Sequence, residues 1–355
     1  MRRGLIAIVV VCACGVASAK PLALEPTSSR GNFFAGREAT LGVVMCGGGP
    51  AAGRLAWTLT AFGRTLAGGT SNVRHDGGPA TITEVAVAIP EVKEGVVVEA
   101  AFTAIFVDAA GTRLASHTQP VRIFPANPFV DQTRWLESLN LVLIDPTGDT
   151  ERVLIAAGVP FTLAQSDADI ASAQPRIIML GEGGSWLDRP DLPALATRWA
   201  ASGVPVLCLA PQDGTLPLSG MADVEGEAVA TRFALERAGA VADLDPRLDN
   251  ADWVAEGRTI TTRVAVVGEG DRAVIRLAAA AEIPGGWPWL QLDYADPAAA
   301  TTAPLVMCGY GIIAHWDETP AARYLLAAIL HRLTADRSAD ASDLLPTTAL
   351  PEKPR

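Results

Sequence analysis

Short apolar segments separated by glycine-rich turns make up the first half of the chain, and no helical period of useful length is found there. The turns include Asp76-Gly77-Gly78, in which glycine permits backbone conformations that other residues avoid. Apolar runs bounded by such turns are typical of β-strands. We predict strands at Thr40–Met45, Leu55–Leu59, Ile82–Ile89, Val96–Val107 and Arg113–Phe124, which form an all-β sandwich over residues 30–128.

Beyond this half, apolar strands alternate with amphipathic helices. Pro125 and Pro128 mark the boundary, because two prolines so close together hinder both a helix and a central strand. Alternation at this pace predicts a three-layer α/β domain with a doubly wound parallel sheet over residues 129–336, with a β-rich insertion at about 255–295. The predicted strands are Leu139–Ile144, Phe161–Ala164, Arg176–Leu180, Val204–Leu209 and Leu305–Tyr310, and the helices are Asp149–Ala157, Asp167–Ala173, Asp191–Ser202 and Thr319–Thr334.

The first nineteen residues have the composition of a signal peptide. Arg2 and Arg3 precede an apolar run, and Ala17-Ser18-Ala19 provides small residues for cleavage. The run is shorter than the ~20 residues of a membrane-spanning helix, so export to the periplasm or beyond is predicted. A lipoprotein anchored through Cys14 is the less favoured alternative. The polar, proline-rich residues 337–355 are predicted to be disordered.

The charge balance narrows the range of partners. The chain has 39 acidic and 28 basic residues and a net charge of −11, which becomes −13 if Arg2 and Arg3 leave with the signal peptide. An acidic protein repels phosphate backbones, so nucleic acid is not expected as a partner. No transmembrane segment is predicted in the remainder of the chain.

After removal of the signal peptide three cysteines remain: Cys46, Cys208 and Cys308. An odd number spread over two domains is not a disulfide framework, and buried thiols are the simpler interpretation. A Cys208–Cys308 bridge is open if their strands are neighbours. No Cys-x-x-Cys or His-x-x-x-His spacing indicates a metal, and no cofactor is predicted.

The segment Gly203-Val-Pro-Val-Leu-Cys-Leu-Ala-Pro-Gln-Asp-Gly214 resembles the nucleophile strand of class I glutamine amidotransferases. In that family a helix, a glycine and a Pro-Val strand lead to a Gly-x-Cys-x-Gly bend. Here Ala210 stands where the catalytic cysteine would be. The family's His-Pro-Glu motif is also missing, because the matching segment reads Ala-His315-Trp-Asp-Glu. The resemblance implies an amidotransferase-like, flavodoxin-like frame without its catalytic pair, and no catalytic role is assigned to His315.

The first half is similar to the immunoglobulin-like β-sandwiches of family 2 glycoside hydrolases. The similarity rests on Trp57-x-Leu59, Gly63, Leu66-x-Gly68, Ile82–Ile89 followed by Pro90, and Val121-x-Ile123-x-Pro125. In those enzymes the sandwich carries no catalytic residue, and too few residues follow here for their (β/α)₈ barrel of ~250 residues. Trp57 is predicted to be a core residue rather than a sugar platform. The resemblance implies an association with carbohydrate but no glycosidase activity.

Three residues are predicted near a pocket: Glu182, Ser185 and Asp213. Each follows an apolar strand, and α/β sheets bind ligands beyond the carboxyl ends of their strands. The sequence around Ser185 fails the Gly-x-Ser-x-Gly pattern at its last glycine, so a serine nucleophile is not favoured.

Two other motifs have simpler interpretations. Gly268-Glu-Gly-Asp-Arg-Ala273 fits a dinucleotide-binding fingerprint, with Asp293 about twenty residues on, but it also fits a hairpin turn between two apolar strands, which we favour. The acids between Asp243 and Asp249 resemble a calcium loop only superficially, because its required glycine is missing.

Trp287 and Trp289 share one face of an expected strand. They form either an exposed platform for a sugar or, as we favour, a clamp that holds the β-rich insertion on the α/β core.

Together these features predict an exported, non-catalytic binding or assembly protein tied to polysaccharide handling at the cell envelope. Its partner would be a polysaccharide or an envelope protein, with the oligomeric state left open. The alternative is a hydrolase or lyase that uses acids at the edge of the α/β sheet. A third class is a structural subunit whose sandwich edge pairs with a larger partner.

Overall fold

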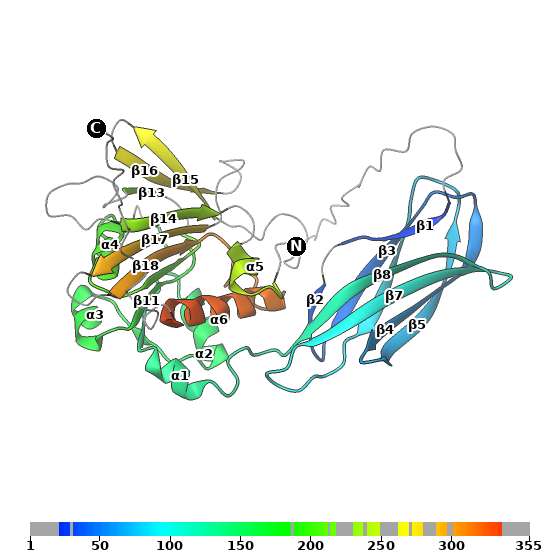
Figure 1. Ribbon diagram of the computed structural model, residues 1–355, viewed down its shortest axis with the longest axis horizontal. Helices are drawn as coiled ribbons and strands as arrows, with labels where there is room; N and C mark the ends of the chain where they lie inside the picture. Colours follow the sequence, from blue (N-terminus) through cyan, green and yellow to red (C-terminus); the bar gives the residue numbers. More distant parts are fainter. Residues whose placement is uncertain are drawn as a thin grey trace, which may run out of the picture. The chain divides into compact units, whose positions relative to one another are not determined.

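The computed structural model describes residues 21–28, 31–185, 188–211, 214–217, 230–236, 240–248, 262–269, 272–279, 289–296 and 301–335. The chain divides into two compact units, the first ending at Ala126 and the second beginning at Asn127 (Figure 1). The predicted signal peptide at 1–19, with Cys14, and the predicted tail at 337–355 lie outside the described residues.

The first unit is a β-sandwich, as its sequence pattern predicts. One sheet has three strands in the order β1-β3-β6, and the other has five in the order β2-β8-β7-β4-β5. Among the described strands of this unit, β2 and β8 pair in parallel and all other pairs are antiparallel. The strands are β1 (Ala23–Pro26), β2 (Asn32–Phe34), β3 (Glu38–Cys46), β4 (Ala51–Ala61), β5 (Arg64–His75), β6 (Thr81–Ala88), β7 (Val98–Asp108) and β8 (Arg113–Phe124).

Alternating side chains of both sheets meet in the core of the sandwich. Along β3, residues such as Leu41 and Val43 are buried while their neighbours are exposed or half-buried, because only one face of the sheet is covered. Trp57 lies in this core, with its ring 6.2 Å from that of Phe102 and packed over Gly69. The prediction that Trp57 is a core residue is therefore confirmed.

The second unit is built on a seven-stranded sheet in the order β10-β9-β11-β12-β18-β17-β14. Its first five strands run parallel, whereas β17 and β14 are antiparallel to their neighbours. The sheet is therefore mixed and mainly parallel, and the doubly wound, three-layer arrangement stays a prediction. The strands are β9 (Leu141–Ile144), β10 (Thr162–Leu163), β11 (Ile177–Leu180), β12 (Val206–Leu209), β14 (Ala230–Glu236), β17 (Trp289–Asp296) and β18 (Thr301–Cys308).

Six helices are described in this unit, and several begin or end where local chemistry requires it. Ser166 and Asp169 form a capping box at the start of α3, and Gly158 ends α2 in a left-handed conformation with φ of 73°. Thr319 accepts a hydrogen bond from the backbone nitrogen of Ala321 and caps α6. The helices are α1 (Thr133–Ser138), α2 (Asp149–Ala157), α3 (Asp167–Ala173), α4 (Leu192–Ala201), α5 (Ala240–Leu244) and α6 (Pro320–Ala335).

Both faces of the central parallel strands β11 and β12 are buried. Helices α3 and α4 pack on one face, where Ile178 and Val206 contribute to the core. The residues that alternate with these, such as Met179 and Leu207, are buried as completely. The continuous apolar runs of these strands follow from this double burial.

A separate three-stranded sheet contains β13 (Gly214–Pro217), β15 (Thr262–Glu269) and β16 (Arg272–Ala279). The antiparallel pairing of β15 with β16 continues to Glu269 opposite Arg272. The hairpin interpretation is therefore confirmed over the dinucleotide fingerprint, which requires a helix at this point.

One of the acids considered for a calcium loop, Asp245, has another role. Both carboxylate oxygens of Asp245 accept hydrogen bonds from the Arg247 guanidinium, and Asp249 lies outside the described residues. Among the residues that the structure describes, no group of three or more His, Cys, Asp or Glu side chains could hold a metal ion. Within the same residues, no helix is long and apolar enough to cross a membrane.

Candidate functional site

Four parallel strands of the second unit end at one edge of the sheet. Strands β9, β11, β12 and β18 end at Ile144, Leu180, Leu209 and Cys308. Because the strands are parallel and adjacent, the loops that follow them gather at the carboxyl edge, where ligands bind in open α/β sheets.

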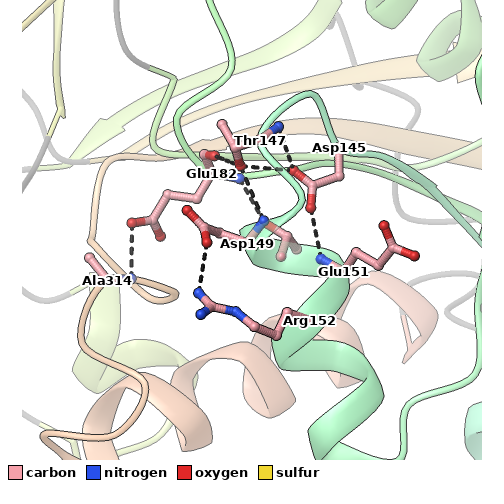
Figure 2. Close-up of polar contacts among 8 residues, drawn as sticks. Asp145, Thr147, Asp149, Glu151, Arg152, Glu182 and Ala314 are labelled. Atoms are coloured by element: carbon pink, nitrogen blue, oxygen red, sulfur yellow. Dashed lines mark hydrogen bonds and ion pairs between the residues drawn. The ribbon is translucent and has the colours of Figure 1, made fainter.

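Glu182, in the loop after β11, extends toward the loop after β18. Its carboxylate accepts a hydrogen bond from the backbone nitrogen of Ile313 at 2.7 Å. It accepts another from the backbone nitrogen of Ala314 at 3.1 Å (Figure 2). Burial raises the pKa of Glu182, while these two hydrogen bonds and the nearby His315 act in the opposite direction. The side chain therefore joins two loops that are 131 residues apart in sequence.

The neighbouring carboxylate, Asp145, forms hydrogen bonds with residues close to it in the sequence. One of its oxygens accepts hydrogen bonds from the backbone nitrogen and hydroxyl of Thr147, and the other accepts from the backbone nitrogen of Glu151 at 2.7 Å (Figure 2). Asp145 thus satisfies a free N–H group in the first turn of α2. Gly181 leaves room for it, since a Cβ there would lie 2.5 Å from Asp145 Oδ1.

Ala210, directly after β12, has the backbone conformation of a strained bend. Its φ is 25°, a region that residues with a side chain rarely adopt, and the residue is buried. The bend is fixed at both ends, because the nitrogen of Ala210 donates to the carbonyl of Cys308 at 2.7 Å and its carbonyl accepts from the nitrogen of Gly183 at 3.1 Å. A methyl group therefore occupies a rigid, sharply turned position at the strand end.

The two thiols near this edge are on opposite faces of the sheet. In the parallel pairing of β12 with β18, Cys208 lies beside Met307, and Leu209 lies beside Cys308. Neighbours in register share a face, so Cys208 and Cys308 point in opposite directions and cannot form a disulfide. Both are free and buried; burial raises the pKa of Cys208 far above its usual range and that of Cys308 to about 12. Neither thiol is a thiolate at neutral pH.

The segment before α6 is held by contacts among its own side chains and with Arg323. His315 is buried, and its Nδ1 lies 3.0 Å from Glu318. Arg323 pairs with Asp317 at 2.7 Å and also donates to the backbone carbonyl of Trp316. These contacts stabilise the start of α6. In them, the Nδ1 of His315 faces the carboxylate of Glu318 rather than a thiol or hydroxyl group.

A pocket of about 240 Å³ opens at the carboxyl edge on the face that carries α3 and α4. Apolar residues line much of it, including Ile144, Leu180 and Leu192. Its polar lining comes from Asp145, Gln165, Ser185, Asp188 and Arg189.

The structure separates the residues that the sequence places near a pocket. Ser185 lines the pocket, whereas Glu182 is not among its lining residues and points toward Ile313 and Ala314. Asp213 lies outside the described residues. Sequence reasoning missed Asp145, although it follows β9 directly and the strand-end rule that selected Glu182 applies to it equally.

The two tryptophans considered for a sugar platform have different outcomes. Trp289 begins β17, pairs with Cys308 and is only 6% exposed, so its ring is not available to a sugar in solution. Trp287 lies outside the described residues.

No protein-family model matches the chain, and no curated protein matches it. Among solved structures, the sporulation control protein Spo0M from Bacillus subtilis is 14% identical with a TM-score of 0.26, over 33% of this chain and 55% of that one. A glycosyl hydrolase family 2 member from Bacteroides cellulosilyticus is 10% identical with a TM-score of 0.24, over 54% of this chain and 32% of that one. A family 2 β-glucuronidase is 12% identical with a TM-score of 0.24, over 54% of this chain and 20% of that one. The chain thus spans less than two thirds of each of these structures, and similarities at this level assign no function.

Proposed function

We propose that this is an exported, non-catalytic binding or assembly protein, whose second unit keeps a doubly wound, amidotransferase-like frame without its chemistry. The observation that carries the proposal is Ala210. It occupies a rigid bend at the end of a buried parallel strand, with φ of 25°, where an amidotransferase would hold its nucleophile. A methyl group there cannot attack a substrate.

The groups around this bend support a binding role. Cys208 and Cys308 are buried, and their raised pKa values keep them protonated. Glu182 has both carboxylate oxygens within hydrogen-bond distance of backbone nitrogens, so its geometry is that of a loop clamp. To act as a catalytic group, Glu182 would first have to give up the two hydrogen bonds by which it joins the loops after β11 and β18.

Polysaccharide is the ligand class that we favour, and the cell envelope is its setting. This part of the proposal follows from the resemblance of the sandwich sequence, from Trp57 to Pro125, to accessory domains of carbohydrate-active enzymes.

One observation favours a hydrolase or lyase as the second candidate. Glu182 is a carboxyl group with a raised pKa at the edge where α/β enzymes place their active sites. A general acid must also reach its substrate, and this carboxylate faces two backbone amides instead.

The test is to incubate the purified protein with a panel of envelope and matrix polysaccharides and to measure both retention and cleavage. We expect saturable retention of at least one polysaccharide, with no new reducing ends and no unsaturated products after long incubation. Cleavage by the wild type that is lost in Glu182→Gln would establish the enzyme alternative. Retention of none of the polysaccharides would refute their assignment as ligands.

A further inference from the structure

The pocket of the second unit combines an apolar interior with a charged rim. Ile144, Leu180 and Leu192 supply apolar surface, and Leu163, on the edge strand β10, remains 38% exposed although it is a leucine. An exposed large aliphatic side chain that lines a cavity is a favourable contact for an apolar ligand group.

The charged groups of the lining differ in whether they already have partners. Arg189 forms a two-pronged ion pair with Asp191, with both nitrogen–oxygen distances at 3.2 Å. Both oxygens of Asp145 accept hydrogen bonds from the backbone around the start of α2. The carboxylate of Asp188, by contrast, makes no hydrogen bond or ion pair with any residue that the structure describes.

The electrostatic balance at the rim is therefore negative. The single arginine of the lining is neutralised by Asp191, which leaves the carboxylate of Asp188 uncompensated. A second acid, Asp167, lies close enough to act on Arg189 electrostatically. An anionic ligand would be repelled by this rim, and a cation would be attracted.

The volume limits the size of the ligand. About 240 Å³ is below the roughly 300–1,000 Å³ of pockets that take drug-sized molecules. A single six-membered ring or a short aliphatic chain with one polar group suits this space. Gln165, whose side chain is on the exposed rim, adds a neutral hydrogen-bonding group for a hydroxyl or an amine.

We propose that this pocket binds the protonated amine of a small ligand or ligand segment that has an apolar or alicyclic body, with Asp188 as its counter-ion. The inference rests on the proposed binding function and names the chemistry that one site would recognise. An amine-bearing residue of a larger ligand and a free small amine share this chemistry.

Three probes with the same ring test the charge preference: cyclohexylmethylamine, cyclohexanemethanol and cyclohexanecarboxylate, each titrated into the full chain and followed by NMR or calorimetry. We expect the amine to bind about two- to fivefold more tightly than the alcohol, as for an exposed ion pair, and the carboxylate to bind most weakly. Added salt should reduce the difference between the amine and the alcohol.

Variants locate the site. Asp188→Asn should abolish the preference for the amine and leave the affinity for the alcohol unchanged. Leu163→Trp fills part of the pocket without adding charge, so it should weaken the binding of the amine and of the alcohol to a similar extent. Ile155→Trp is the matched control, because Ile155 is an exposed aliphatic residue on α2 outside the pocket lining. If Leu163→Trp lowers the Tm, Gln165→Trp replaces it at the rim.

Several outcomes would overturn the proposal: tightest binding of the carboxylate, an amine preference that survives Asp188→Asn, or no saturable binding of any probe at millimolar concentration. These outcomes are separable from the polysaccharide test. Amine binding without polysaccharide retention would refute only the polysaccharide assignment, and the reverse would refute only the role given to this pocket.

Discussion

The strands of the two units are buried in different ways, although both units depend on β-sheets. In the sandwich, β3 alternates between buried residues and residues that are exposed or half-buried, so its sheet presents one face to the core. In the α/β unit, all four residues of β11 and of β12 are buried, because both faces of that sheet are covered.

This difference determines where each unit can place polar chemistry. A strand of the sandwich has a position outside the core at every second residue, and in β3 the polar residues Glu38 and Thr40 lie exposed at such positions. A strand buried on both faces, such as β11, has no such positions, and the carboxylates Asp145 and Glu182 come after the ends of β9 and β11. The contrast explains why the carboxyl edge holds the candidate site.

The largest expected effect comes from adjacent core positions. In β11, Ile178→Ala and Met179→Ala should each cost about 2–5 kcal/mol, since both side chains are fully buried. In β3, Leu41→Ala should cost a similar amount, but Thr40→Ala should change stability by less than about 0.5 kcal/mol because Thr40 is exposed. Urea unfolding of the four variants measures this. If either Ile178→Ala or Met179→Ala left the free energy of unfolding unchanged, burial on both faces of β11 would be contradicted.

The next largest effect concerns two glycines. A Cβ on Gly181 would meet Asp145 Oδ1 at 2.5 Å, so Gly181→Ala should cost about 1–3 kcal/mol through displacement of the carboxylate that caps α2. Gly78, in a turn of the sandwich, has nothing within 4 Å of the same position, and Gly78→Ala should be neutral or stabilising by up to about 1 kcal/mol.

A double-mutant cycle identifies the cause. If the clash with Asp145 is responsible, Gly181→Ala and Asp145→Ser together should cost less than the sum of the single variants, as judged by urea unfolding. Strict additivity would assign the loss to the backbone at Gly181 instead.

Much of the fold could be predicted, because burial leaves a pattern in the sequence. Helices α2 and α3 match the predicted ranges Asp149–Ala157 and Asp167–Ala173, and β8 matches Arg113–Phe124. Strand β5 was missed, since an edge strand that is mostly exposed carries few apolar residues. The antiparallel strands β14 and β17 were missed as members of the main sheet, because pairing between distant segments leaves no local signal.

The candidate site could be predicted only in part. The strand-end rule placed Ser185 by the pocket, because it depends on position alone. It could not show that Glu182 points toward Ile313 and Ala314, since those partners lie more than a hundred residues away in the sequence. The partner of Arg189, two residues along the chain, was visible in the sequence, but its position in the lining was not.

A smaller effect, with a defined dependence on pH, tests the half-buried carboxyl group of Glu182 in the α/β unit. Among the described residues of the sandwich, the buried polar side chains are Asn32 and His75, and neither is a carboxyl group. Burial raises the pKa of Glu182 in the folded protein above that in the unfolded chain. The folded state therefore binds this proton more tightly, and the associated stability is present in acid and lost as pH rises through the raised pKa.

Glu182→Gln cannot titrate, so the free energy of unfolding of the wild type minus that of the variant should decrease as pH increases. Urea unfolding at a series of pH values measures this difference, with Glu137→Gln, at an exposed position on α1, as the control for the loss of a charge. A difference that grows with pH would mean that the backbone hydrogen bonds outweigh burial and lower the pKa instead.

The smallest expected effect is at the surface, where the two units should behave alike. Arg152 pairs with Asp149 at 2.7 Å on α2, and Arg74 pairs with Asp76 at 3.1 Å in the sandwich, with all four side chains more than 60% exposed. Solvent screens both pairs, so double-mutant cycles should give coupling energies of only about 0.2–1 kcal/mol that decrease with added salt. The shorter distance in the α/β unit should bring no advantage, because exposure rather than separation limits the interaction. A coupling well above this range in α2 alone would show that the helix N-terminus strengthens the pair, and that the units differ at their surfaces as well as in their cores.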